Sequence, residues 1–147
     1  MAGKSRTILI VAAGIAAIVI AGMLAMHFLS APSDDLDLSR SKASAAGLYR
    51  VSVAPEAEPL RQGPLHSWIV TVATPDGAAV EDARITVDGG MPQHSHGLPT
   101  EPQSTGHIGD GRYRIEGVRF NMGGWWVLKF AIEAPAGRDE AEFNVVL

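Results

Sequence analysis

The segment Met91-Pro-Gln-His-Ser-His-Gly-Leu-Pro-Thr100 carries side chains that can bind a metal ion. One methionine and two histidines lie within six positions, on a segment rich in glycine and proline. Thioether and imidazole ligands together suit copper, especially the reduced ion. The chain has no cysteine to supply the commoner soft ligand, and zinc is less suited because methionine is not among its usual ligands. The residue types therefore predict a copper site, against the simpler alternative of an exposed polar loop.

Two more residues are candidates for the same site. His94 and His96 are two positions apart, and in an extended segment that spacing points both imidazoles to one side. Met122 is the only other methionine beyond the apolar N-terminal stretch, and His107 follows within the same 17-residue window that Met91 opens. We therefore expect a site formed by Met91, His94, His96 and Met122, with His107 as a further contributor.

The elements that must position these residues are expected to be short β-strands. Polar and apolar residues alternate between glycine and proline turns, and no helical periodicity is present after the N-terminal stretch. This pattern predicts an all-β, immunoglobulin-like antiparallel sandwich. Tyr113, in Asp110-Gly-Arg-Tyr, resembles the tyrosine corner of such sandwiches, in which the hydroxyl bonds back to the backbone. The expected strands are residues 48–53, 67–73, 83–88, 111–118, 125–133 and 140–146.

The candidate ligands lie in the expected connections of this sandwich. Residues 91–108 form a long connection stiffened by prolines, and a connection of that length is usually functional when it is not disordered. Alternate connections emerge at opposite ends, so the connections after the 83–88 and 112–118 strands could share an end and bring Met122 to the histidines. Of the adjacent Trp125 and Trp126, one ring is expected in the core and one outside, where it could cover the site or a partner surface.

The N-terminal stretch predicts a membrane anchor. Residues 8–29 contain no charge, and as a helix they would be about 33 Å long, enough to span a bilayer. Lys4 and Arg6 precede this span and aspartates follow it, which makes residues 1–7 cytoplasmic and the rest exported. A cleaved signal peptide is the alternative, but its apolar region is usually shorter, and Pro32 follows a poor cleavage site.

The exported part is expected to be a linker, residues 30–47, followed by one periplasmic domain, residues 48–147. Without Lys4 and Arg6 the chain keeps 10 basic and 16 acidic side chains, so it has no basic surface for nucleic acid. The absence of cysteine means that an ordinary core must hold the domain together. Paired carboxylates and a phosphate-binding glycine loop are also missing, so an enzyme is not expected.

The stretch from Gly90 to Trp126 resembles the YtkA-like and FixH-like families. These are small bacterial proteins with an N-terminal membrane helix and an extracytoplasmic immunoglobulin-like domain. The resemblance implies a copper-related role with Met91, His94, His96 and Met122 as ligands, and FixH-like proteins are implicated in maturation of haem–copper oxidases. It rests on Met91-Pro92, His94, His96-Gly97, Pro99-Thr100, Gly109-Asp-Gly-x-Tyr113 and Met122-x-Gly124-x-Trp126.

Two functions of different class follow. The first is a copper-binding module tethered to the cell membrane by one helix, which holds the ion or passes it to a membrane or periplasmic cuproprotein. The second is a structural or assembly subunit of a membrane complex that binds no metal and uses the histidine loop as a rigid contact surface.

Overall fold

The computed structural model describes residues 14–23 and 35–147. The chain divides into two compact units, Met1–Ser33 and Asp34–Leu147. In the first unit, residues 14–23 form a helix. No helix within the described residues is long and apolar enough to cross a membrane. The predicted cytoplasmic end and the remainder of the predicted span, residues 8–13 and 24–29, lie outside the described residues.

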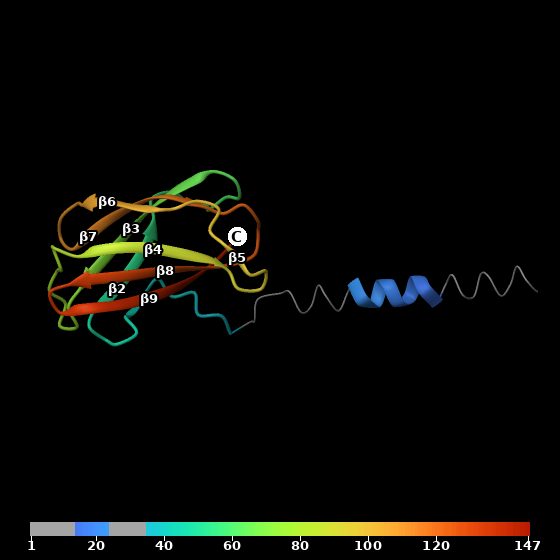
Figure 1. The fold of residues 1–147 in the computed structure, drawn as a ribbon, viewed down its shortest axis with the longest axis horizontal. Coiled ribbons are helices and arrows are strands. Elements are labelled where there is room, and N and C mark those ends of the chain that lie inside the picture. Colours follow the sequence, from blue (N-terminus) through green and yellow to red (C-terminus); the bar gives the residue numbers. More distant parts are fainter. Residues whose placement is uncertain (1–13, 24–34) are drawn as a thin grey trace, which may run out of the picture. The chain divides into compact units, whose positions relative to one another are not determined.

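Residues 35–147 form two antiparallel β-sheets packed face to face (Figure 1). One sheet has the strand order β1-β2-β3-β7-β6 and the other has the order β5-β4-β8-β9. The predicted all-β sandwich is therefore confirmed. The strands are β1 (Ser41–Ala43), β2 (Arg50–Pro55), β3 (Leu65–Ala73), β4 (Arg84–Met91), β5 (His96–Gly97), β6 (Gln103–His107), β7 (Arg112–Arg119), β8 (Trp125–Ala134) and β9 (Gly137–Val146).

The core lies between the sheets and follows from strand alternation. Successive side chains of a strand point to opposite faces, so every second residue of a half-buried strand is apolar. In β3 the inward residues include Trp68 and Val70, and in β8 they include Trp126, Leu128 and Phe130, all fully buried. Trp125, the neighbour of Trp126, is only half-buried. One ring of the tryptophan pair is thus inside and one outside, as predicted.

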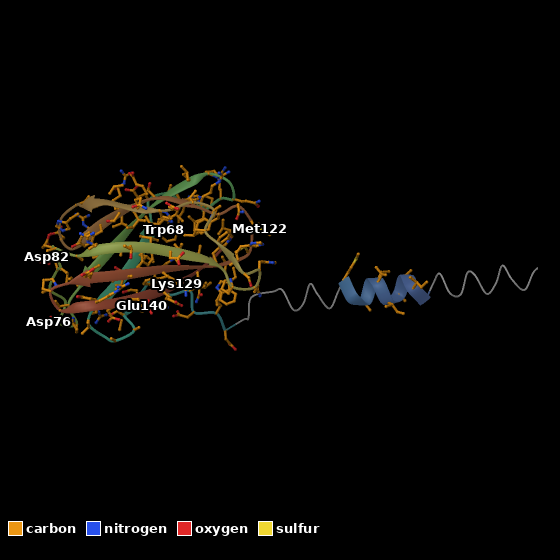
Figure 2. All side chains as sticks on the ribbon, viewed as in Figure 1. Trp68, Asp76, Asp82, Met122, Lys129 and Glu140 are labelled. Carbon is orange, nitrogen blue, oxygen red and sulfur yellow. The ribbon has the colours of Figure 1, made fainter. Side chains whose placement is uncertain are left out.

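The connections gather at two ends of the sandwich, which Figure 2 shows as the ends labelled by Met122 and by Asp76 and Asp82. We call the first the Met-His end; it holds the connections 56–64, 92–95 and 120–124 and residue 147. We call the second the Asp139 end; it holds the connections 44–49, 74–83, 108–111 and 135–136.

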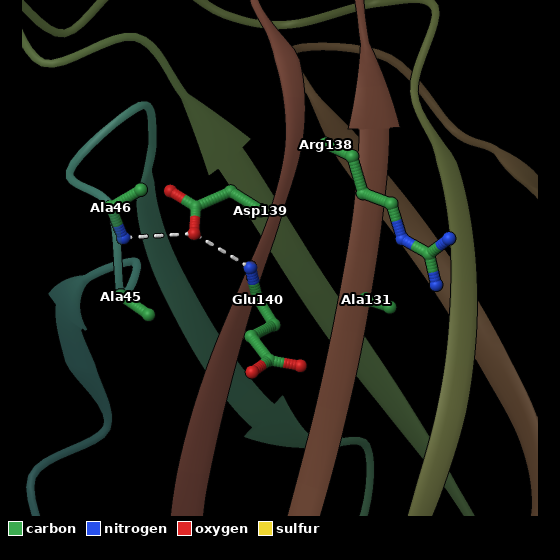
Figure 3. Close-up of a pocket in the computed structure, with 6 residues that line it drawn as sticks. All are labelled: Ala45, Ala46, Ala131, Arg138, Asp139 and Glu140. Carbon is green, nitrogen blue, oxygen red and sulfur yellow. Dashed lines mark hydrogen bonds between the residues drawn. The ribbon is translucent and has the colours of Figure 1, made fainter.

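The domain begins earlier than the sequence predicted. Part of the expected linker, residues 35–47, is folded into it, because β1 pairs with β2 and the segment after β1 is bonded to Asp139 at the start of β9. The Asp139 carboxylate accepts hydrogen bonds from the Ser44 hydroxyl (2.5 Å) and from the backbone N–H groups of Ala46 (2.9 Å), Leu48 (3.0 Å) and Glu140 (2.8 Å). Figure 3 shows two of these bonds.

Asp139 is buried, and its ionisation reflects these bonds. Burial acts to raise the pKa of Asp139, but the hydrogen bonds from Ser44 and the three backbone N–H groups outweigh it and hold the pKa at about 2. A buried carboxylate with this many donors is fully satisfied. The shallow pocket that Asp139 lines with Ala45, Ala46 and Arg138 (Figure 3) therefore contains a structural carboxylate rather than a free ligand.

The predicted long connection over residues 91–108 contains two strands, β5 and β6, as well as the last residue of β4. β4 continues through Gly89 and Gly90 to Met91, turns over residues 92–95, and returns as β5, with Gly90 opposite Gly97 and Met91 opposite His96. Gly90 lets β5 come close to β4, because a Cβ at this position would collide with the carbonyl oxygen of His96. The chain then crosses to the other sheet and forms β6 along β7.

Tyr113 bonds to the backbone, but not as a tyrosine corner does. Its hydroxyl donates to the carbonyl of Val80 (2.6 Å) and accepts from the N–H of Ala83 (2.8 Å). Both partners lie about 30 residues upstream, in the connection from β3 to β4, rather than a few residues away. Burial raises the pKa of Tyr113, so the hydroxyl stays protonated and fixes the start of β4.

Candidate metal centre

Three connections meet at the Met-His end. Gly90 of β4 is opposite Val127 of β8, which places the turn 92–95 beside the connection 120–124 that precedes β8. Gly124 exchanges backbone hydrogen bonds of 3.1 Å with Leu147, and the N–H of Gly63 donates to the carbonyl of Phe120 (2.8 Å). The connections after β4 and after β7 therefore share an end, as the sequence predicted.

His94 and His96 lie in a tight turn rather than in an extended segment. The N–H of His94 donates to the carbonyl of Met91 (3.1 Å), and Ser95 between the histidines has a φ of 52°. Although the turn and not an extended segment joins them, the two rings still lie side by side. The two rings are stacked, with centroids 6.3 Å apart and an interplanar angle of 18°, and both residues are exposed.

The four histidines of residues 35–147 differ in what their ring nitrogens contact. His66 Nε2 lies 2.8 Å from the Arg61 carbonyl oxygen, and His107 Nε2 lies 2.6 Å from the Glu81 carboxylate. Within the described part of the chain, His94 and His96 have neither a hydrogen bond nor an ion pair through their side chains, and their rings stack on each other. Two exposed imidazoles are thus adjacent with their nitrogens free to bind a ligand.

Met91 lies directly behind this pair. It is opposite His96 in the ladder, so the two side chains leave the same face of the sheet with Cβ atoms about 5 Å apart. The Met91 side chain is only 1% exposed, and its methyl group would be 3.2 Å from a Cβ at Gly124, a residue with φ of 115°. Gly124 therefore makes the space in which Met91 packs.

Met122 approaches from the neighbouring connection. Its carbonyl accepts a hydrogen bond from Nε1 of the buried Trp126 (3.0 Å), which fixes the backbone there. Its side chain is 38% exposed and lies at the same end of the sandwich, where Figure 2 labels it. The sequence analysis allowed Met122 and the histidine turn to share an end, and in the structure they do.

His107 is separated from the other candidates. It ends β6 at the Asp139 end, paired with Glu81, and its ring centroid is 5.0 Å from that of Tyr113. Tyr113 is bonded to Ala83, next to the start of β4, whereas Met91 ends that strand. Eight residues of strand span about 25 Å. His107 therefore does not join the Met-His end, because β6 carries it along the sheet to the opposite end.

An open groove of about 530 Å³ adjoins the histidine turn. Met91, Ser95 and His96 line one side, and the half-buried ring of Trp125 lines another. The indole Nε1 donates to the Asn144 side chain (2.9 Å), which sets the ring's orientation. Lys129 and Glu142, which form an ion pair (2.7 Å), also line the groove. Sequence reasoning missed Asn144, Lys129 and Glu142, because only the register of β8 with β9 brings them beside the turn.

The donor types at this end restrict which metal fits. The described residues contain no group of three or more His, Asp or Glu side chains that could hold a metal ion. A site at the Met-His end therefore depends on methionine sulfur beside the two imidazoles. That set does not suit hard cations, which take oxygen ligands, and it does suit copper.

The fold and this end define a small β-sandwich that presents methionine and histidine side chains on two adjoining connections. The chain belongs to the YtkA-like family, whose model matches residues 43–131, more than half of the sequence. The match runs from the end of β1 into β8 and includes all the candidate ligands. No curated protein and no solved structure gave a match.

Proposed function

We propose that this protein is a membrane-tethered copper-binding module of the periplasm. The copper ion would be bound at the Met-His end by the imidazoles of His94 and His96 and the thioethers of Met122 and Met91. The bound reduced ion would be the cargo, which the domain passes to a membrane or periplasmic cuproprotein. No catalytic step is assigned to the domain.

The observation that carries this proposal is the contrast among the histidines. His66 and His107 have their nitrogens engaged by protein oxygen atoms, whereas His94 and His96 are exposed, stacked and free of such partners. Imidazole binds copper through a deprotonated ring nitrogen. The two free rings have one thioether behind them and another on the adjoining connection, and this grouping supports a soft-metal site.

The tether and the finer fold assignment belong to the same proposal. The order β2-β3-β7-β6 in one sheet and β4-β8-β9 in the other corresponds to the ABED and CFG strands of immunoglobulin-like sandwiches. The uncharged stretch over residues 8–29 and the lysine and arginine before it support a single anchor with an exported domain.

Copper titration of the purified chain tests the proposal. The protein is equilibrated with Cu(I) under reducing conditions in the presence of a competing chelator. We expect one bound ion per chain, with a lower affinity in His96→Ala and an unchanged affinity in His66→Ala, whose histidine is held by Arg61. Absence of copper binding by the unaltered chain ends the proposal. If the chain then retains a stoichiometric membrane partner in the presence of chelator, the assembly role is supported instead.

A further inference from the structure

The Met-His end is also where the chain from the N-terminal unit enters the domain. The carbonyl of Asp37 accepts a hydrogen bond from the Asn144 side chain (2.8 Å), near the end of β9. The carbonyl of Arg40 accepts from the N–H of Val53 (2.8 Å), near the end of β2. Both strands finish at the Met-His end, so the first residues of the domain lie there, beside the candidate copper ligands.

The exposed apolar side chains of the domain gather at the same end. Leu65 is the first residue of β3, and Val146 is the last residue of β9. Met122 lies in the connection 120–124, and Leu38 lies in the segment by which the chain enters the domain. Ile108 alone lies at the Asp139 end. We therefore take this end as the candidate contact surface of the domain. In residues 35–147, the large apolar residues exposed by more than a third are Leu38 (52%), Leu65 (65%), Ile108 (46%), Met122 (38%) and Val146 (44%).

Both ends carry carboxylates, and some of these are in ion pairs. The connections 92–95 and 120–124 contain no charged residue, and 56–64 contains Arg61 besides two glutamates. One of those glutamates, Glu56, is paired with Arg114 (2.7 Å), and Asp37 of the entering chain is paired with Lys42 (2.6 Å). The entering chain also carries Asp35. The connections of the Asp139 end contain Asp76, Glu81, Asp82 and Asp110, of which Glu81 is paired with His107 (2.6 Å) and Asp110 with Arg112 (3.4 Å).

We propose that the Met-His end of the domain lies against the phospholipid headgroups of the membrane, with Leu65, Met122 and Val146 in contact with them. The proposal rests on the anchor in the proposed function. Six residues from Ser30 to Asp35 span at most about 20 Å, so this end stays close to the bilayer. The exposed apolar side chains of this end suit the headgroup boundary.

This orientation identifies the class of copper partner. With the Met-His end at the headgroups, the candidate ligands open onto the membrane surface. The ion is then within reach of a metal site near the outer surface of an integral membrane protein, and farther from a partner that approaches the Asp139 end from the periplasm.

Site-specific fluorescence measures the orientation directly. The chain has no cysteine, so Asn121→Cys and Ala136→Cys each introduce one labelling site, on an exposed residue at the Met-His end and at the Asp139 end respectively. The labelled full chain is reconstituted into phosphatidylcholine vesicles that contain a lipid with a headgroup quencher. The ends are about 33 Å apart along ten-residue strands, so we expect the label at residue 121 to be quenched roughly threefold or more relative to that at 136.

A pair of matched variants tests the contact surface. Leu65→Glu places a carboxylate at the Met-His end and should reduce quenching of the label at residue 121, whereas Ile108→Glu at the other end should not. Both side chains are exposed, so neither change disturbs the core. Equal quenching of the two labels, in a chain that floats with the vesicles, overturns the proposal.

Flotation and copper titration of the same samples separate this inference from the proposed function. A chain that does not float with vesicles overturns the anchor and the orientation together. Equal quenching with copper bound overturns the orientation alone, and unequal quenching without copper binding supports the orientation while the copper function fails.

Discussion

At the Asp139 end of the sandwich a buried carboxylate accepts four hydrogen bonds, whereas at the Met-His end two exposed imidazoles stack on each other without a hydrogen bond or ion pair among the described residues. The difference teaches how to separate structural polar groups from candidate ligands. A buried charge must be compensated inside the fold, so Asp139 is committed to holding the N-terminal segment. Exposed imidazoles need no such partner, and these two remain free to bind an ion.

Removal of Asp139 should have the largest effect on stability. In Asp139→Ala the buried hydroxyl of Ser44 and the partly buried N–H groups of Ala46 and Leu48 lose their acceptor. We expect the free energy of unfolding to fall by about 3 kcal/mol, as measured by urea denaturation, with copper affinity per folded molecule unchanged. An unaltered unfolding midpoint would show that these bonds do not hold the segment.

Removal of both free histidines should lower copper affinity and leave the stability of the domain almost unchanged. For the double variant His94→Ala and His96→Ala we expect copper affinity to fall about 100-fold, or about 2.7 kcal/mol. Both side chains are exposed, so the free energy of unfolding should change by less than about 0.5 kcal/mol. The control is His107→Ala, which removes an imidazole from the Asp139 end and should leave copper affinity intact. Equal losses in the control and the double variant would contradict the assignment.

Acid should weaken the Asp139 end first. The pKa of Asp139 is about 2 in the folded chain against an ordinary value of 3.8. Because the folded-state value is the lower one, this carboxylate contributes its full stabilisation above about pH 4 and loses it as the pH falls toward 2. The contribution is about 2 kcal/mol. Urea unfolding of the unaltered chain and of Asp139→Asn at pH 5, 3 and 2 measures it; the difference between them should shrink with falling pH, and a constant difference would refute the mechanism.

Methionine replacements should have the smallest effects and should sharpen the ligand set. Met122→Leu and Met91→Leu each remove a sulfur while keeping an apolar side chain of similar size, a change that usually costs less than about 1.5 kcal/mol of stability. We expect each to weaken Cu(I) binding about tenfold, or about 1.4 kcal/mol, by competition titration. Met91→Ala, which also opens a cavity in the core, should lose more stability than Met91→Leu. If Met91→Leu binds Cu(I) normally, Met91 serves packing alone.

The main strands of the sandwich could be predicted from the sequence because their patterns are local. Alternation in residues 67–73 and 125–133 is set by which side chains face the core, and a turn signal such as Pro75-Asp76-Gly77 lies within a few residues. The shorter strands could not be predicted from local patterns. β1 is held by long-range bonds to β2 and Asp139, and β6, Gln103–His107, is an exposed polar edge strand without apolar alternation.

The positions of the candidate site residues could also be predicted only in part. The position of Met122 beside the histidine turn followed from connection order, which is a rule of sandwich topology. The position of His107 did not, because nearness in sequence to Met91 says nothing once β6 runs to the far end. The pairing of β4 with β5 was also missed. Gly89 and Gly90 were expected to end the strand, whereas the lack of a side chain at Gly90 lets β5 approach β4, and the lack of one at Gly89 lets β8 do so.

The central claim is that copper binds at the Met-His end through nitrogen and sulfur together. X-ray absorption spectroscopy of the Cu(I)-loaded full chain tests it most directly, because the fine structure distinguishes the two kinds of ligand atom. We expect both imidazole nitrogen and sulfur around the copper, with loss of nitrogen in the double variant His94→Ala and His96→Ala and loss of sulfur in Met122→Leu. Copper bound without sulfur, or with spectra unchanged in these variants, would contradict the account.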